Sequence, residues 1–390
     1  MHRLRIVIVV AIGAMVCAAC SSIPAPSESA VALTPAAPTS TTAVGHASAS
    51  TATHEPTPTP MPEIGFRALD TPAGYSRSQA EAVDGTTAVG WVQVGIADEQ
   101  PAVWDTTSGA LRVLSVPKEF VHPNGDTFVR LEGVSGTTAV GTGILGAKGK
   151  RGQTRAMAWD LATGDLRILD IPAPFTQTEA HAIDGTTAIG QSWTAHGETG
   201  APVTWDTESG AVRSLEVPAG IVCIDPHAVS GDTIVGTRCD DDDAMPVVWS
   251  PITAEARDLD MLPATRGGIP RAVDGVTAVG ECCFGEEGTP LPMAWDTATG
   301  AVRQLSLPAP FAHGSAVGVS GSIAVGRADT TQLVWDLGTD DVRVLPAPPG
   351  YDEYSEALAV SGRTIAGYAC QPPASISESW RCVAAAWTLP

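Results

Sequence analysis

The chain has 390 residues, with 22 basic and 43 acidic side chains, so its formal net charge at pH 7 is −21. An electrostatic field of this sign repels phosphate groups, and we therefore expect neither nucleic acid nor a bare anionic lipid surface among its partners. The length alone suggests about two domains, but internal repeats have to be sought before domains are counted.

The first 20 residues have the layout of an export signal. Two arginines precede an apolar run over residues 6–16, which is too short to span a bilayer. The next four residues, Cys17 to Cys20, resemble the lipobox of bacterial lipoproteins, which implies cleavage before Cys20 and acylation of its thiol. That family prefers leucine where Cys17 stands, so plain secretion is the alternative.

Residues 20–62 are rich in alanine, proline, serine and threonine and hold almost no large apolar side chain. Such a segment cannot bury enough surface to offset the entropy lost on ordering. We predict a signal peptide over residues 1–19, a disordered tether over 20–62 and a folded domain over 63–390. The protein is then expected in the cell envelope outside the cytoplasm, attached to the membrane only through its lipid.

The folded part contains seven copies of a short phrase that reads like Ala-Val-Asp-Gly-Thr-Thr-Ala-Val-Gly. The copies recur every 41 to 51 residues, and a tryptophan follows each of them. The first glycines of the phrases are Gly85, Gly136, Gly185, Gly231, Gly275, Gly321 and Gly362, and the tryptophans are Trp104, Trp159, Trp205, Trp249, Trp295, Trp335 and Trp387.

Each unit is expected to contain four short strands. In the first unit, the first strand ends at Val83 and a tight turn follows at Asp84-Gly85. The second, third and fourth strands are expected at residues 87–90, 102–104 and 111–114. Four strands per period, without helical periodicity, are typical of a propeller blade. The sequence thus predicts an all-β, seven-bladed propeller.

The two ends of the array predict how the ring closes. The last unit stops after its third strand, at Trp387, and an isolated fourth strand, residues 66–70, precedes the first unit. Joining the two completes the last blade and removes exposed sheet edges. An open solenoid is the alternative, but it gives no reason to divide one repeat between the ends.

Two repeat families resemble these units. Residues 156–169 look like the third and fourth strands of a WD repeat, although no unit has that family's Gly-His dipeptide. Residues 178–183 and 355–360, each followed by the glycine turn and a short glycine-ended strand, are more similar to HAF-type extracellular repeats. That second resemblance implies a propeller outside the cytoplasm and implies no reaction.

Residues found in nearly every unit are interpreted as structural. The tryptophans are expected in the blade cores, the aspartates that follow most of them as turn caps, and the outer-strand arginines along apolar surface with occasional ion pairs. The arginines are Arg67, Arg112, Arg167, Arg213, Arg257, Arg303 and Arg343.

Irregular segments gather in the loops between second and third strands, and binding sites commonly lie in such loops. Trp193, Phe284 and Trp380 are the candidate ligand contacts there. A run of four carboxylates, Asp240, Asp241, Asp242 and Asp243, lies near Glu286 and Glu287; it predicts either a solvated acidic loop or a weak calcium site. No other cofactor is predicted.

Six cysteines lie in the folded part, as expected for an oxidising compartment. Cys223 and Cys239 are equidistant from a hairpin glycine, and Cys370 and Cys382 flank one loop symmetrically. We predict these two disulfides, which by elimination leave Cys282 and Cys283 as a vicinal pair. Fifteen pairings are possible, and a zinc site lacks support from CxxC spacing or clustered histidines.

A second departure from the repeat lies four residues before the turn glycine, on the innermost strand. The residues there are Glu81, Glu132, His181, His227, Arg271, Val317 and Leu358. The first five are candidate ligand contacts at the central channel, with solvated strand ends as the alternative. The sequence favours a monomeric binding or scaffolding protein for an envelope protein or extracellular ligand; a hydrolase or lyase that uses the channel Glu and His residues is the alternative.

Overall fold

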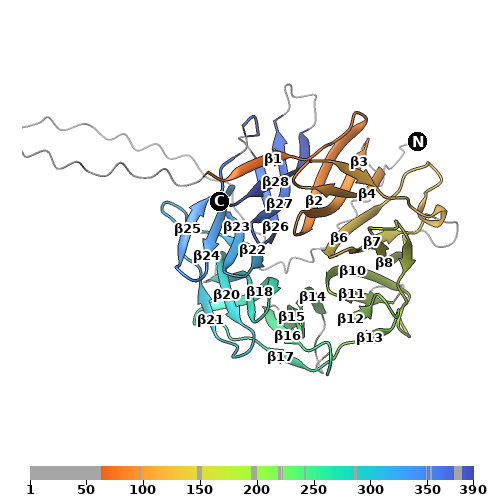
Figure 1. Ribbon diagram of the computed structural model, residues 1–390. Coiled ribbons are helices and arrows are strands. Elements are labelled where there is room, and N and C mark those ends of the chain that lie inside the picture. The colour runs from red at the N-terminus through yellow and green to blue at the C-terminus, as the bar shows by residue number, and fades with distance from the viewer. Residues whose placement is uncertain are drawn as a thin grey trace, which may run out of the picture.

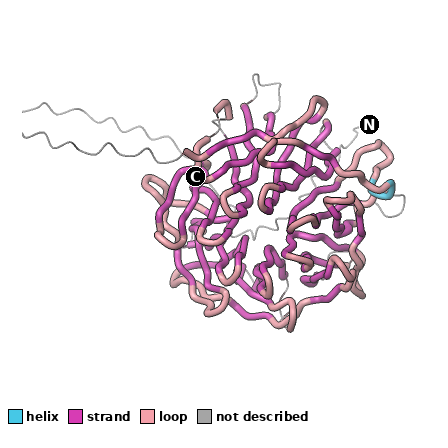
Figure 2. Tube along the Cα trace, viewed as in Figure 1, coloured by secondary structure: helices cyan, strands magenta, loops and turns pink. Residues whose placement is uncertain are grey.

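The computed structural model describes residues 63–95, 98–146, 152–194, 200–217, 221, 223–240, 243–284, 288–347, 349–351, 354–372 and 380–390. Within these ranges the chain forms seven antiparallel four-stranded sheets that surround a central axis as the blades of a propeller (Figure 1). Strands make up nearly all of the regular structure (Figure 2), and the described helix is a single 3₁₀ turn at Lys118–Phe120. No helix in the described part of the chain is long and apolar enough to cross a membrane.

Each blade runs from an inner first strand to an outer fourth strand, and blades 1 to 6 follow one another along the chain. The first strands are β2 (Tyr75–Asp84), β6 (Val129–Ser135), β10 (Gln177–Asp184), β14 (Cys223–Ser230), β18 (Thr265–Asp274), β22 (Ser315–Ser320) and β26 (Tyr354–Ser361). The second strands are β3 (Thr87–Val94), β7 (Thr138–Ile144), β11 (Thr187–Trp193), β15 (Thr233–Asp240), β19 (Thr277–Phe284), β23 (Ile323–Ala328) and β27 (Thr364–Gln371). The third strands are β4 (Asp98–Asp105), β8 (Thr154–Asp160), β12 (Gly200–Asp206), β16 (Asp243–Trp249), β20 (Thr289–Asp296), β24 (Thr331–Asp336) and β28 (Arg381–Thr388). The fourth strands are β5 (Leu111–Val113), β9 (Leu166–Ile168), β13 (Val212–Ser214), β17 (Ala256–Asp258), β21 (Val302–Gln304), β25 (Asp341–Val344) and, for blade 7, β1 (Gly65–Ala68).

Blade 7 closes the ring as the sequence predicted. Its strand order is β1-β28-β27-β26, and Phe66 of β1 lies opposite Trp387 of β28. Every first strand contacts the first strands of both neighbouring blades, including β26 with β2. The prediction of a seven-bladed propeller completed by an N-terminal strand is therefore confirmed.

The repeated tryptophans lie in the hydrophobic layers between blades and are at most 2% exposed. Trp205 of blade 3, for example, packs with Val140 and Leu169 of blade 2. Six of the seven indole N–H groups donate to a carbonyl just after the outer strand of the preceding blade, as Trp205 does to Asp170 at 2.7 Å. Trp159 is the exception, because its buried Nε1 has no partner among the described residues.

A ring of hydrogen bonds also joins the seven inner hairpin turns. The turn glycines have φ between 51° and 57°, a left-handed conformation that favours glycine. The backbone N–H of each turn glycine donates to the aspartate or serine that precedes the turn glycine of the previous blade. The acceptors and donors are Asp84 and Gly136, Ser135 and Gly185, Asp184 and Gly231, Ser230 and Gly275, Asp274 and Gly321, Ser320 and Gly362, and Ser361 and Gly85.

The outer-strand arginines also join neighbouring blades, which the sequence does not predict, and Arg303 forms one of the expected ion pairs, with Asp340. Arg112 donates to the carbonyl of Leu161 at 2.5 Å, in the turn between the third and fourth strands of the next blade. Arg67, Arg167, Arg213, Arg257 and Arg303 donate to equivalent turns. Arg343 has no such partner among the described residues, because it faces blade 7, whose third and fourth strands are not joined by a turn.

The structure contains both of the disulfides expected at paired strand positions. Cys223 lies opposite Cys239 in β14 and β15, and Cys370 lies opposite Cys382 in β27 and β28. The vicinal pairing is wrong, because Cys282 is a free buried thiol. Burial raises the pKa of this thiol to about 11 and keeps it protonated.

Candidate functional site

The column of residues four positions before the turn glycine is a column of β-bulges. In each blade the first strand shifts register here, and the bulged residue has no partner on the second strand, as for Glu81 between Ala80 and Ala82. The same shift occurs at Glu132, His181, His227, Arg271, Val317 and Leu358. A bulge re-aims a side chain and often lies beside a functional site.

The same close backbone approach accompanies the bulge in every blade. The second strand carries a glycine opposite each bulge, and a Cβ atom at Gly90 would collide with the carbonyl oxygen of Gln79. The same collision is found at Gly141, Gly190, Gly236, Gly280, Gly326 and Gly367. These glycines therefore allow seven bulged side chains to be presented in one ring around the axis.

Blades 2 to 4 place acidic groups and histidines next to one another in this ring. His181 lies between two carboxylates, with Nε2 3.9 Å from Glu179 and Nδ1 3.5 Å from Asp225. His227 Nε2 lies 3.6 Å from the other oxygen of Asp225. Each imidazole Nδ1 also bonds a carbonyl of the following blade, Pro226 at 3.0 Å and Pro270 at 2.6 Å.

Burial and neighbouring charges shift the pKa values of the groups in this cluster in opposite directions. Burial raises the pKa of Glu132 to about 8, with His181 only partly opposing the shift. Burial alone would lower the pKa of His181, but Glu179, Asp225 and Glu132 outweigh it and raise that pKa to about 10. Burial would raise the pKa of Asp225, yet His227 and His181 together lower it to about 2. At pH 7 the cluster therefore combines a neutral acid with an ionised carboxylate.

The raised pKa of Glu132 predicts a change in how stability depends on pH. Its ordinary pKa is 4.5 and its folded value is about 8, so its stabilising proton is fully present below pH 4.5 and is lost as the pH rises through 8. We expect Glu132→Gln, which stays neutral, to lose less stability than the parent protein between pH 5 and pH 9. Urea unfolding across this range measures the difference, with Glu208→Gln in an exposed turn as the control. Parallel profiles for the parent and Glu132→Gln would show that Glu132 titrates normally.

A groove of about 510 Å³ opens where blades 7, 1 and 2 meet, at the end of the ring that carries the second-to-third strand loops. Aromatic and charged side chains line it together. The lining residues are Arg77, Ser78, Gln79, Trp91, Gln93, Glu99, Arg130, Tyr354, Tyr368, Cys370, Trp380 and Cys382. We call this site the blade-7/1/2 groove.

Arg130 and Trp91 form one wall of the groove. Arg130 donates twice to Glu99, at 2.5 and 2.6 Å, and its guanidinium carbon lies 4.9 Å from the centroid of the Trp91 ring. Trp91 Nε1 donates to Glu81 at 2.7 Å, and Gln79 donates to the same oxygen at 3.0 Å. Burial nevertheless raises the pKa of Glu81. This wall is held in place by charge-assisted bonds and ring stacking.

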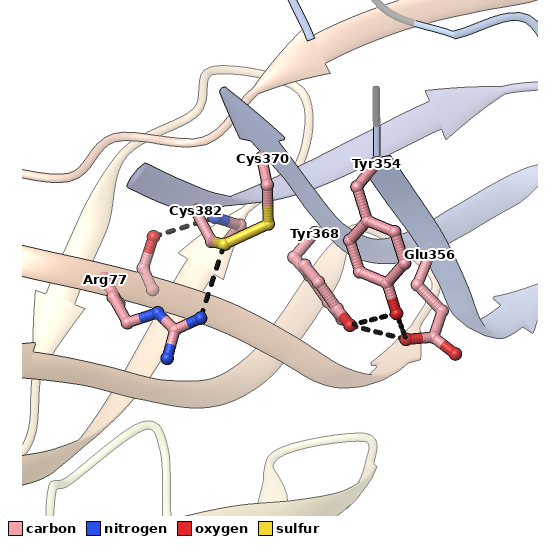
Figure 3. Close-up of a disulfide and its surroundings, with 8 residues drawn as sticks. Arg77, Tyr354, Glu356, Tyr368, Cys370 and Cys382 are labelled. Atoms are coloured by element: carbon pink, nitrogen blue, oxygen red, sulfur yellow. Dashed lines mark hydrogen bonds between the residues drawn. A yellow bond between two sulfur atoms is a disulfide. The ribbon is translucent and has the colours of Figure 1, made fainter. Parts of the chain in front are cut away.

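Tyr354 and Tyr368 line the groove on blade 7, and both are bonded to Glu356 (Figure 3). Tyr368 donates to Glu356 at 2.5 Å, and Tyr354 donates to the same oxygen at 3.3 Å. The two tyrosine rings lie 5.9 Å apart, and Arg327 lies 3.5 Å from the second oxygen of Glu356. Burial, together with the charge of Glu356, raises the pKa of Tyr368, so this phenol remains a hydrogen-bond donor.

The ligand contacts predicted from sequence do not lie together in one site. Trp380 is 41% exposed and lines the groove, whereas Trp193 ends β11 and Phe284 ends β19, and neither lines it. Arg271 pairs with Glu281 at 2.7 Å on blade 5.

Several other predicted residues lie outside the described ranges: Asp241, Asp242, Glu286, Glu287 and the predicted lipidation site Cys20. The side chains of Asp240 and Asp243 are not described either. Among the described residues, no three His, Cys, Asp or Glu side chains are placed to hold a metal ion.

Sequence reasoning missed the residues beside the bulges. Glu179, Asp225 and Glu356 lie two positions before their bulges, and Trp91 and Tyr368 lie six positions after their turn glycines. Side chains two residues apart on a strand share a face. A comparison of these two columns across the seven units would therefore find them in the sequence.

The comparisons with known proteins support the fold. No protein-family model matches the chain, and no curated protein matches it in sequence. An oligogalacturonate lyase from Vibrio parahaemolyticus is similar in structure, with a TM-score of 0.50 and 11% identity over 84% of this chain and 97% of that chain. A prolyl endopeptidase gives a TM-score of 0.50 at 13% identity, over 80% of this chain and 47% of that one.

The propeller domain of the Trilobed protease from Pyrococcus furiosus also gives a TM-score of 0.50, at 10% identity over 80% of this chain and 94% of that one. That domain has an open velcro topology, whereas in this protein β1 pairs with β28 in one sheet. At such identities the likeness shows the propeller fold alone.

Proposed function

We propose that this protein is a monomeric binding protein of the cell envelope, which takes an extracellular ligand or a segment of an envelope protein into the blade-7/1/2 groove. Acylated Cys20 anchors it to the membrane, and the segment over residues 20–62 is the tether. The groove carries this proposal, since it gathers aromatic rings and charged groups from three blades into one concave site. Ligand sites are commonly concave, with aromatic walls and a few fixed polar groups.

The internal bonding of the groove supports binding. Arg130 is fixed by Glu99, and Tyr368 is fixed by Glu356, so neither side chain has to be ordered when a ligand enters. Preorganised side chains reduce the entropy lost on binding. Trp380 adds an exposed aromatic anchor at the rim.

Tryptophan fluorescence tests this function directly, because Trp91 and Trp380 line the groove. The full-length protein is titrated with neutral and charged oligosaccharides and short peptides. For any ligand that binds, we expect Trp380→Ala to weaken binding at least tenfold and Phe284→Ala to leave it unchanged. Phe284 is the matched control, because it is an exposed aromatic outside the groove. A ligand that is sensitive to Phe284→Ala and insensitive to Trp380→Ala would place binding elsewhere.

A second candidate function is a hydrolase or lyase that acts at the histidine cluster of blades 2 to 4. The specific observation in its favour is the divergence of two carboxyl pKa values, about 8 for Glu132 and about 2 for Asp225, on either side of His181. One neutral acid and one ionised carboxylate are the pair that such a reaction needs. The propeller of this protein aligns with 97% of the oligogalacturonate lyase chain, so that lyase contains little besides a propeller. A propeller without a second domain is therefore compatible with catalysis. Product formation from a bound ligand that Glu132→Gln abolishes would favour this candidate; binding without turnover favours the first.

A further inference from the structure

Arg77 differs from the other charged residues of the blade-7/1/2 groove. It lies on β2 with an exposed side chain, and its guanidinium points toward the Cys370–Cys382 disulfide (Figure 3). Its one hydrogen bond among the described residues goes from NH2 to Cys382 Sγ, at 3.6 Å. Sulfur is a weak acceptor and carries no charge here, so most of the donor capacity of this arginine is unused.

Three other arginines on first and second strands of the blades have carboxylate partners. Arg130 pairs with Glu99, Arg271 with Glu281 and Arg327 with Glu356. Arg77 has no carboxylate partner among the described residues, in a chain with 43 acidic and 22 basic side chains. Its charge is therefore available to a ligand.

Three carboxylates that line the groove or bond its lining residues are already bonded to other groups. Glu99 accepts both bonds of Arg130, and Glu356 accepts bonds from Tyr354 and Tyr368. Glu81 accepts bonds from Trp91 and Gln79. None of these three carboxylates forms an ion pair with Arg77, whose guanidinium has no anionic partner in the described part of the chain.

We propose, on the basis of the binding function above, that the groove takes a small organic carboxylate, with Arg77 holding the carboxylate and the body of the ligand lying against Trp380 and Tyr354. The planar guanidinium presents two parallel N–H donors that match both oxygens of a carboxylate. Trp380 and the tyrosine pair supply aromatic surface for a ring. The ligand class is thus a ring that bears a carboxylate group.

Paired probes test this proposal on the full-length protein. Glucuronate is compared with glucose, and phenylacetate with phenylacetamide, so each acid has a neutral counterpart and the two pairs separate sugar rings from aromatic rings. We expect one acid to bind at least tenfold more tightly than its counterpart in a fluorescence titration, and added sodium chloride to weaken it. Arg77→Gln should remove this tenfold preference, and Arg77→Lys should keep part of it.

Arg343→Gln is the matched control, since Arg343 is an arginine on the outer strand β25 that has no carboxylate partner among the described residues and lies outside the groove. It should leave the preference for the acid unchanged. Equal binding of acid and neutral probes, binding that Arg77→Gln does not alter, or failure of both acids to bind overturns the carboxylate proposal. If neutral ligands bind and Trp380→Ala weakens them, the groove remains the binding site while the carboxylate proposal fails. If no ligand responds to Trp380→Ala, the binding function fails as well.

Discussion

Deleting residues 1–70 is expected to lower the free energy of unfolding of the propeller by about 5 kcal/mol or more, because the burial of Leu69 alone is worth about 2–5 kcal/mol. β1 pairs with β28 over four residues, and Leu69 is 2% exposed in the core shared by blades 7 and 1. The ring of Phe66 lies 5.6 Å from that of Trp387. The deletion also removes the Asp70 carbonyl that accepts the indole N–H of Trp104 at 3.0 Å.

The matched control deletes residues 1–61 and retains β1. It should unfold at the same urea concentration as the mature protein, because the composition of the removed segment predicts no packed core. Both proteins are produced with a new export signal so that the disulfides form. Equal urea midpoints for the two deletions would show that β1 contributes little to closure. Leu69→Ala in the full chain provides a milder version of the same test.

The second large loss of stability is expected for the repeated tryptophans in the hydrophobic layers between blades. Trp205→Ala should destabilise the propeller by about 3–5 kcal/mol, because it leaves a cavity between blades 2 and 3 where Trp205 packs with Val140 and Leu169. Urea unfolding monitored by circular dichroism measures the loss. A cost below about 1 kcal/mol would mean that the layer collapses around the smaller residue.

A pair of phenylalanine variants separates packing from hydrogen bonding at this position. Trp205 donates to the Asp170 carbonyl at 2.7 Å, whereas the buried Nε1 of Trp159 has no partner among the described residues. Both rings are 1% exposed, so the apolar change is similar. Trp205→Phe leaves the Asp170 carbonyl without this donor, and we expect it to cost about 1 kcal/mol more than Trp159→Phe. The reverse order would show that the indole hydrogen bond contributes nothing net.

The repeat count, the closing strand and the two disulfides could be predicted from the sequence because each depends on residues near one another in the chain or on the same repeat period. Asp84-Gly85 encodes a hairpin, and Cys223 and Cys239 are equidistant from Gly231. A hairpin fixes the register of its two strands, so the sequence also fixes which residues lie opposite one another.

The contacts between blades were decided by the tertiary structure. Asp84 was predicted as a turn residue, but its side chain also accepts a bond from Gly136 of the next blade. Arg112 is predicted to lie along apolar surface, and its guanidinium also donates to the carbonyl of Leu161 in the next blade. Both bonds depend on the rotation between neighbouring blades, which the sequence of one blade does not specify.

The candidate site also has one part that the sequence predicts and one part that depends on the tertiary structure. The column four residues before the turn glycines departs from the repeat in the sequence, and the structure places its five polar residues around the axis. The blade-7/1/2 groove was not foreseen, because closure of the ring brings Arg77 of blade 1 next to Cys382 of blade 7, 305 positions away. The sequence by itself determined the blades and the strands around the axis, since hairpins and periodicity are local. Only the closed ring decided which loops share a groove, because that depends on where the first and last blades meet.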